Sequence, residues 1–201
     1  MTTDRVIVED KKIALQDCLE AHSYQHCTID AGSERVHLAD VFFEHCDFVG
    51  DFTNNELFDC QLTHCNLANI DWHKSVFSGV RFDSCRMTGA LMDTCRFVQC
   101  ELRAVGGQML NCAESEFSQC HITDSDLTDS SFQAARCKEG LAFPDCVLTG
   151  ADFTAINLKN WDFSAARFDS LSFDPQRLRG VKLASWQAPV ILALLGVQLE
   201  A

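Results

Sequence analysis

Residues 60–69 read Cys-Gln-Leu-Thr-His-Cys-Asn-Leu-Ala-Asn, so an apolar residue returns after five positions, at Leu62 and Leu67. The same five-residue period runs from Phe52 to Cys137, and the residue at this position usually has a large side chain. After one extra residue it resumes at Phe143 and continues to Leu183. Neither a helix nor an ordinary strand has a period of five.

A second periodic position lies two residues before each apolar one, and it is occupied mostly by a small residue, Cys, Ala or Ser. A short fixed period is typical of a solenoid, in which each unit buries its apolar side chains only against its neighbours. The sequence therefore predicts a rod, with one continuous body over most of its 201 residues.

The overall composition excludes several classes of function. The chain has 29 acidic and 16 basic residues and a formal net charge of −13, which argues against direct nucleic-acid binding. The first residues lack the basic and apolar regions of a signal peptide. The longest apolar stretch, at 188–197, is too short to span a bilayer. We therefore expect a soluble cytoplasmic protein with no membrane partner.

The twelve cysteines follow the repeat and do not form a disulfide pattern. Nine occupy the small position, Cys112 and Cys137 occupy the large apolar position, and Cys18 lies outside the pattern. Such cysteines are expected to be small buried thiols in a reducing compartment. The pairs His26-Cys27, His45-Cys46 and His64-Cys65 suggest metal ligands, but adjacent side chains of extended backbone point to opposite faces. We predict no metal and no cofactor.

The units Cys65-Asn-Leu-Ala-Asn, Ser125-Asp-Leu-Thr-Asp and Ala151-Asp-Phe-Thr-Ala resemble the pentapeptide-repeat family. That resemblance implies an all-β fold, a right-handed quadrilateral β-helix with four pentapeptides in each coil. Residues twenty apart would then stack about 4.8 Å apart. We expect a lead-in at 1–13, a β-helix at 14–183 of about eight coils and on the order of 40 Å in length, and a C-terminal segment at 184–201.

Three places interrupt the period. Before Phe52 the period shifts by one residue twice, which predicts kinks or bulges at 30–37 and 49–51, with Leu19, Tyr24 and Ile29 sharing one phase. The later slip, at 138–143, contains Gly140 and precedes Pro144, both common in turns. Gly107 keeps the phase but leaves a hole that a neighbouring side chain must fill.

The C-terminal segment has a different pattern. Ser185 is a candidate N-cap for a short helix that runs through Leu195 and stops at Gly196. The helix is too apolar for an exposed surface, which predicts a cap on the last coil that also forms a homodimer interface. The alternative is a cap that packs only on its own chain. The expected interface residues are Trp186, Val190, Ile191, Leu194 and Leu195.

No motif of a hydrolase, nucleotide-binding protein or metalloprotease is present, so we do not expect an enzyme. Acidic residues instead gather near mid-length, where no Lys or Arg occurs between Arg103 and Arg136. The candidate partner-facing acids are Glu114, Glu116, Asp124, Asp126, Asp129, Asp145 and Asp152. They would form a band of negative charge around the rod, spread over several of its sides. The alternative is that outward positions are polar only for solubility.

The segments Arg179-Gly-Val-Lys-Leu183 and Leu194-Leu-Gly-Val197 resemble the topoisomerase-protection branch of the family, which includes quinolone-resistance (Qnr-type), albicidin-resistance and microcin-immunity proteins. This resemblance implies a tail-to-tail dimer similar to duplex DNA in width and charge. Such a dimer would bind DNA gyrase, with topoisomerase IV as a second target, and protect it from an antibiotic or toxin. The chain lacks the long insertion between coils on which protection depends in well-known members. The alternative is a scaffolding repeat protein with no topoisomerase target.

Overall fold

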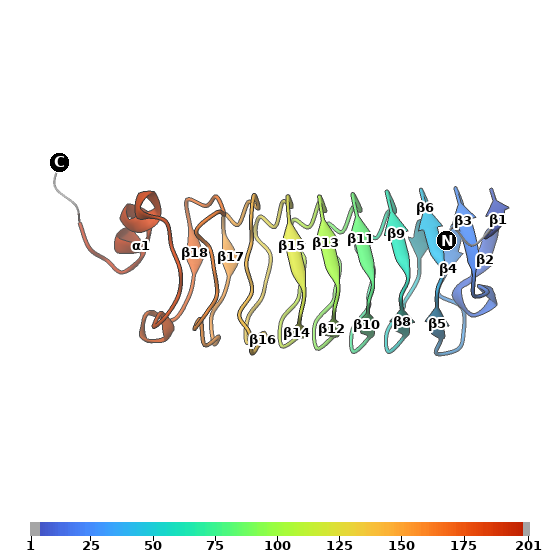
Figure 1. Cartoon of the computed structure of the whole chain (residues 1–201), viewed down its shortest axis with the longest axis horizontal. Helices are drawn as coiled ribbons and strands as arrows, with labels where there is room; N and C mark the ends of the chain where they lie inside the picture. The colour runs from blue at the N-terminus through green and yellow to red at the C-terminus, as the bar shows by residue number, and fades with distance from the viewer. Residues whose placement is uncertain (1–4, 199–201) are drawn as a thin grey trace.

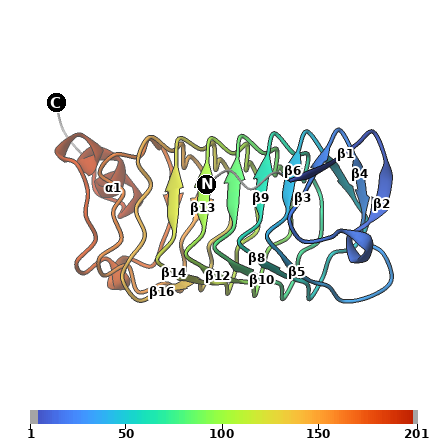
Figure 2. The ribbon, with the colours of Figure 1, turned by 45° about the vertical axis from the view of Figure 1, so that its right-hand side comes forward.

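The computed structural model describes residues 5–198. Short parallel strands stack along a rod, with β1 at one end and the helix α1 at the other (Figures 1 and 2). The rod has about eight turns, which confirms the predicted four-sided β-helix. The N-terminal end of the lead-in (1–4) and the last residues of the C-terminal segment (199–201) lie outside the described residues.

We name the four walls A to D in the order in which one coil visits them, through Leu57, Leu62, Leu67 and Trp72. Wall A is a six-stranded sheet and wall B a seven-stranded sheet. Wall C begins as a three-stranded sheet and continues as single β-bridges, and wall D consists of bridges and one strand pair.

The strands of wall A are β5 (His37–Ala39), β8 (Glu56–Phe58), β10 (Val76–Ser78), β12 (Arg96–Val98), β14 (Glu116–Ser118) and β16 (Arg136–Cys137). Those of wall B are β1 (Val6–Glu9), β3 (His22–Gln25), β6 (Phe42–Glu44), β9 (Gln61–Thr63), β11 (Arg81–Asp83), β13 (Glu101–Arg103) and β15 (His121–Thr123). Wall C has β2 (Lys12–Ala14), β4 (Thr28–Asp30) and β7 (Asp47–Val49), and wall D has β17 (Ala151–Asp152) and β18 (Leu171–Ser172). The helical turns are η1 (Leu15–Asp17), η2 (Pro175–Arg177), η3 (Ser185–Gln187) and α1 (Ala188–Leu194).

The large apolar residues form the predicted columns inside the rod. Phe77 pairs in register with Phe97, and Phe97 with Phe117. The rings of Phe97 and Phe117 are nearly parallel, with centroids 4.9 Å apart. The hole at Gly107 is filled, because a Cβ there would lie 2.9 Å from Leu127. The core is therefore one continuous stack of side chains.

The corners explain why the repeat has its particular small and polar residues. The residue two after each large apolar one takes a positive φ at most corners, for example 54° at His64 and 55° at Ser84. The small residue lies inside the next corner, where its side chain reaches a main-chain carbonyl of the previous coil: the Ser115 hydroxyl donates to Met92 O at 2.7 Å. On walls C and D an Asp or Asn oxygen commonly accepts the N–H two residues on, as between Asp71 and His73 at 2.9 Å. Such Asx turns satisfy amides that the bridges leave free.

All twelve cysteines are free, and ten are buried, with Cys120 and Cys137 partly exposed. In the corners, Cys sulfur replaces the Ser hydroxyl, and the Cys95 thiol donates to Trp72 O at 3.0 Å. Burial raises the pKa of Cys95 to about 12. The Cys95 thiol is therefore protonated and fills its corner as a small apolar side chain.

The irregular places lie where the sequence predicts them, with one error. In the first coils, paired residues are nineteen apart, as in Tyr24 with Phe43 and Ile29 with Phe48. The prediction for Leu19 was wrong: its side chain is 58% exposed, and Leu15 is buried instead. The turn η1 lifts the chain off the coil path here, so the phase of Tyr24 does not extend back to Leu19.

The C-terminal segment forms η3 and then α1, with Pro189 in the first turn of α1 and Gly196 at a φ of +79° after it. The expected N-cap was wrong, because Ser185 makes no side-chain capping bond. Gln187 does this instead: its Oε1 accepts from Ala184 N, and its Nε2 donates to Phe163 O and Ala166 O at 2.7 and 2.8 Å. Fully buried, Gln187 pins the helix to the last coils.

Candidate interaction surfaces

The seven acids predicted to face a partner are spread over the whole circumference of the rod. Glu114, Asp124, Asp129 and Asp145 are exposed at corners with positive φ. Glu116, Asp126 and Asp152 lie on walls A, C and D. They therefore surround the rod and do not converge on one point.

Three of these carboxylates are already engaged within the chain, and Asp152 accepts from the Thr154 amide at 2.8 Å. Glu116 forms ion pairs with Arg136 at 2.8 Å and with Arg96 at 3.5 Å, so wall A is not negative there. Asp126 accepts hydrogen bonds from both the amide and the hydroxyl of Thr128 and from Gln108. Although burial raises its pKa, these bonds lower it overall, so Asp126 stays charged.

Wall D carries a row of carboxylates of which only Asp152 is among the seven predicted acids. Asp51 and Asp71 are bridge partners on adjacent coils, and Asp93 follows on the next coil. The coils of Asn111 and Ser131 have no carboxylate at this place, and Asp152 and Asp174 follow on the next two coils toward the C-terminus. The twenty-residue period could have revealed this row, since its members lie one residue before or after the large apolar residue of wall D.

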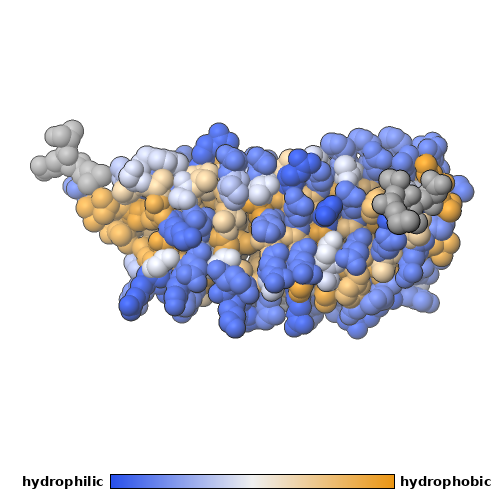
Figure 3. Space-filling model, in the orientation of Figure 1, coloured by the Kyte–Doolittle hydropathy of each residue, from blue (hydrophilic) through white to orange (hydrophobic). Residues whose placement is uncertain are grey.

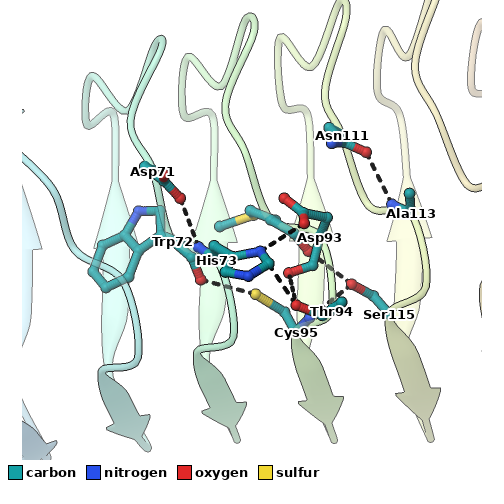
Figure 4. Close-up of polar contacts among 10 residues, drawn as sticks. Asp71, Trp72, His73, Asp93, Thr94, Cys95, Asn111, Ala113 and Ser115 are labelled. Atoms are coloured by element: carbon teal, nitrogen blue, oxygen red, sulfur yellow. Dashed lines mark hydrogen bonds and ion pairs between the residues drawn. The ribbon is translucent and has the colours of Figure 1, made fainter.

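His73 lies among the first three of these carboxylates (Figure 4). Its Nδ1 lies 2.6 Å from Asp93 Oδ2 and 3.3 Å from the Thr94 hydroxyl. Its main-chain N–H donates to Asp71, so His73 contacts the carboxylates of two coils, one through its backbone and the other through its ring. The cluster is shallow and fixed, and it offers an ordered acidic surface to a partner.

The C-terminal end of the rod exposes apolar side chains (Figure 3). Trp186 is 55% exposed, and Leu194, Leu195 and Val197 are 39, 41 and 45% exposed. Ile191, by contrast, is buried over the last coil, and Val190 packs partly against the core. Of the five predicted interface residues, the structure leaves Trp186, Leu194 and Leu195 free to meet a partner.

The histidines of the three His-Cys pairs point outward while the cysteines are buried, as expected. The rings of His26, His45 and His64 stack along one corner, with centroids 5.2 and 4.9 Å apart. Within residues 5–198, no group of three His, Cys, Asp or Glu side chains is arranged to hold a metal ion. None of the described helices is long and apolar enough to cross a membrane.

Residues 56–93 match the pentapeptide-repeat family, with eight copies of the repeat. Among solved structures, the chain is similar to HetL of the cyanobacterium Nostoc sp. strain PCC 7120, a pentapeptide-repeat protein involved in the regulation of heterocyst differentiation. The two are 13% identical with a TM-score of 0.67, over 90% of this chain and 86% of HetL. At this identity the likeness concerns the fold alone.

A trypsin-treated form of QnrB1, a plasmid-mediated fluoroquinolone resistance protein, is 19% identical to this chain with a TM-score of 0.48. The match covers 97% of this chain and 100% of that one. No curated protein matches the chain in sequence.

Proposed function

We propose that this chain, which belongs to the pentapeptide-repeat proteins, is a non-catalytic acidic rod that dimerises and binds DNA gyrase in place of DNA. Topoisomerase IV is a second candidate target. The bound rod would protect the enzyme from an antibiotic or toxin that traps its cleaved-DNA complex. The branch assignment is supported by the resemblance of the C-terminal segment, and the site by the surfaces described above.

The carboxylate row of wall D is the observation that carries the proposal. Asp51, Asp71 and Asp93 lie on three successive coils, which are spaced by about the distance between β-strands, 4.8 Å, and duplex DNA carries a phosphate about every 3.4 Å along each strand. Asp51, Asp71 and Asp93 are held in such a row by Asx turns and by His73. A rigid row of this kind would present negative charge to a basic DNA-binding groove without ordering on contact.

Dimerisation would double the length of this charged rod, and the exposed apolar end supplies the surface for it. Light scattering should give twice the chain mass of 22.4 kDa. Leu194→Asp should give a monomer, because a charge buried in an apolar interface is strongly unfavourable. Leu91→Asp is the control, since Leu91 is similarly exposed at 40% but lies on wall D. A wild-type monomer at micromolar concentration would rule out the dimer.

A supercoiling and cleavage assay with purified gyrase tests the function. Excess protein should inhibit supercoiling because a DNA mimic competes with DNA, and smaller amounts should relieve the cleavage complex that a gyrase poison stabilises. Binding should weaken as salt rises, since attraction between surface charges is screened over about 10 Å at 0.1 M salt. No binding, and no change in cleavage with any poison, would favour the scaffold alternative.

The charge row can be tested with a matched pair of variants. Asp71→Asn/Asp152→Asn removes two charges from wall D, while the amide oxygens can still accept the Asx-turn bonds to His73 and Thr154. Asp10→Asn/Asp59→Asn removes two charges at corners of positive φ, where Asn is well tolerated. The first variant should weaken gyrase binding severalfold and the second much less.

The mid-rod acids give a second comparison. Glu116→Gln/Asp124→Asn/Asp126→Asn/Asp129→Asn should weaken binding more than changes to the N-terminal acids Glu9 and Asp10. The acid Asp4 belongs to the same N-terminal group but lies outside the described residues. Equal losses from both groups would mean that overall charge, and not its position on the rod, drives association.

A further inference from the structure

The wall of the rod is open at one place. On wall A a groove of about 660 Å³ lies between the coil of Arg136–Lys138 and the coil of Asn157–Lys159, and it reaches Arg177 on the coil beyond. Wall A has a strand on each coil up to β16, and β16 pairs only with β14. The groove begins where this sheet ends.

The missing contacts are those of the backbone. In the middle of the rod, main-chain bonds join each wall A strand to the next coil, as in Gly79 N to Val98 O and Gln99 N to Ser118 O. In the part of the chain that the structure describes, no main-chain bond joins residues 136–139 to 156–159. Because β16 pairs on one side only, the N–H group of Cys137 lies on its free edge, and neither it nor the N–H group of Asn157 has a hydrogen-bond partner there.

The other three walls stay joined at the same level. Asp124 N donates to Pro144 O on wall B, Leu127 N to Val147 O on wall C, and Phe132 N to Asp152 O on wall D. Wall B keeps this one bond at the corner after β15, whereas walls C and D keep their bridges, so the opening does not divide the rod.

The groove is basic, although the chain carries a net charge of −13. Arg136, Lys138, Lys159 and Arg177 line it, and no acidic side chain does. Arg136 is paired with Glu116, and Arg177 with Asp174 at 3.3 Å. Over residues 5–198, Lys138 and Lys159 form no ion pair. The groove is therefore lined by two ammonium groups that can bind an anion.

We propose that this groove binds an acidic, extended peptide segment of a partner protein. Its main chain would pair with the free N–H groups of Cys137 and Asn157, as in strand addition to a sheet edge. Its carboxylates would meet Lys138 and Lys159. The unpaired backbone favours a peptide over a free phosphate, which would use the charges only. This inference is independent of the proposed topoisomerase target, because it concerns the opposite charge on a different wall.

The probe for this site is a fluorescein-labelled peptide of about eight residues, long enough in extended form to cross the groove, with alternating Glu and Val. Its anisotropy should rise with added protein, and a peptide with Gln in place of Glu should bind more weakly. Lys138→Gln/Lys159→Gln should weaken binding of the Glu peptide by about three- to tenfold, as for the loss of two exposed ion pairs. Lys11→Gln/Lys12→Gln changes the net charge equally at the far end of the rod and should have little effect.

Hydrogen exchange tests the backbone pairing separately, because ion pairs with the lysines alone would not protect main-chain amides. With peptide bound, the amides of Cys137 and Asn157 should gain protection, while those of wall B at the same level should not change. Equal weakening by the two lysine pairs, or no gained protection, would overturn the proposal. Displacement of the peptide by inorganic phosphate at similar concentration would show a simple anion site and would overturn it too. No topoisomerase enters this experiment, so its failure leaves the gyrase proposal untouched.

Discussion

The closed middle of the rod can be compared with the open place on wall A between residues 136–138 and 157–159, which we call the junction. Both are built from the same repeat, but the coil at the junction is one residue longer. In the middle, Phe97 and Phe117 are twenty residues apart, and every wall is joined to the next coil. At the junction, Asp126 pairs with Val147, so one residue has been added to the turn of the helix. The added residue falls in 138–142, directly after wall A. A single insertion thus opens wall A, leaves one corner bond on wall B, and leaves walls C and D bridged.

The local geometry shows how the insertion is accommodated. Gly140 has a φ of +87°, and a Cβ at this position would lie 2.2 Å from the main-chain oxygen of Asn160 on the next coil. The chain therefore bulges at the corner and then returns to register at Phe143, which is fully buried. Solenoids can absorb such a bulge because each coil contacts only its neighbours.

Thiol labelling should give the largest contrast between the two regions. Cys112 in the middle is 1% exposed, whereas Cys137 at the junction is partly exposed. Burial raises the pKa of both thiols, so access decides their relative rates. If Cys112 reacts only after global unfolding that costs about 5 kcal/mol or more, it should react at least about 10³ times more slowly than Cys137. Mass spectrometry after timed labelling measures both sites.

Cys137→Ser supplies the control for this experiment, since it should remove one fast-reacting thiol. Cys120, the other partly exposed cysteine, should stay. Similar rates at Cys112 and Cys137 in the folded protein would mean that the middle coils are not closed.

A core substitution in the middle should have the largest effect on stability. Phe117 is buried and stacked on Phe97, so Phe117→Ala should lower the free energy of unfolding by about 3–5 kcal/mol. His121→Ala, on the exposed side of wall B, should cost less than about 0.5 kcal/mol. Urea unfolding of both variants checks the phase of the repeat, and equal losses would show that the assigned inside and outside are wrong.

Glycine substitutions compare the corner of the junction with a corner of the middle. Gly140→Ala should cost about 2–3 kcal/mol, because it adds strain at positive φ and forces the main chain of Asn160 to move. Gly89→Ala meets only the end of the Asn69 side chain, and alanine already occupies corners of this kind at Ala104 and Ala134. Its cost should be about 1 kcal/mol or less. A larger loss at Gly89 than at Gly140 would contradict the tight approach of the two coils.

Much of this architecture could be predicted from the sequence because the period is local. The spacing of five fixed which side chains are inside, and the slip placed the irregular corner at Gly140. Leu19 was misplaced because η1 interrupts the coil path without changing the apolar pattern nearby. Ser185 was misassigned because the capping bonds come from Gln187, whose partners Phe163 and Ala166 are far away in sequence.

The surfaces were less predictable than the core. A surface is formed by the outward residues of several coils together, so it can be recognised only when the coils are aligned, as for the row of carboxylates on wall D. The groove of wall A depends on which backbone bonds an inserted residue breaks, and side-chain type does not encode that. The walls that stay closed at the junction should nevertheless show the ordinary chemistry of the repeat, and Asp162 on wall B allows a test.

Asp162 pairs with Ala142 across the closed side of the junction. Its carboxylate accepts from the Ser164 hydroxyl at 2.6 Å and the Ser164 amide at 3.0 Å, and it lies 3.5 Å from Lys182 Nζ. The Ser164 hydroxyl first, and then the Ser164 amide and Lys182, lower the pKa of this carboxyl against the opposing effect of burial. Because the pKa is lower in the folded than in the unfolded chain, the stabilisation is present above the unfolded value of about 3.9 and is lost as pH falls through the folded value. Asp162→Asn can keep the turn bond from the Ser164 amide but loses the charge, so it should lower the free energy of unfolding by less than about 1 kcal/mol at pH 7. The difference from wild type in urea unfolding should shrink below about pH 4. A difference that stays constant down to acid pH would mean that shape, and not charge, holds this wall closed.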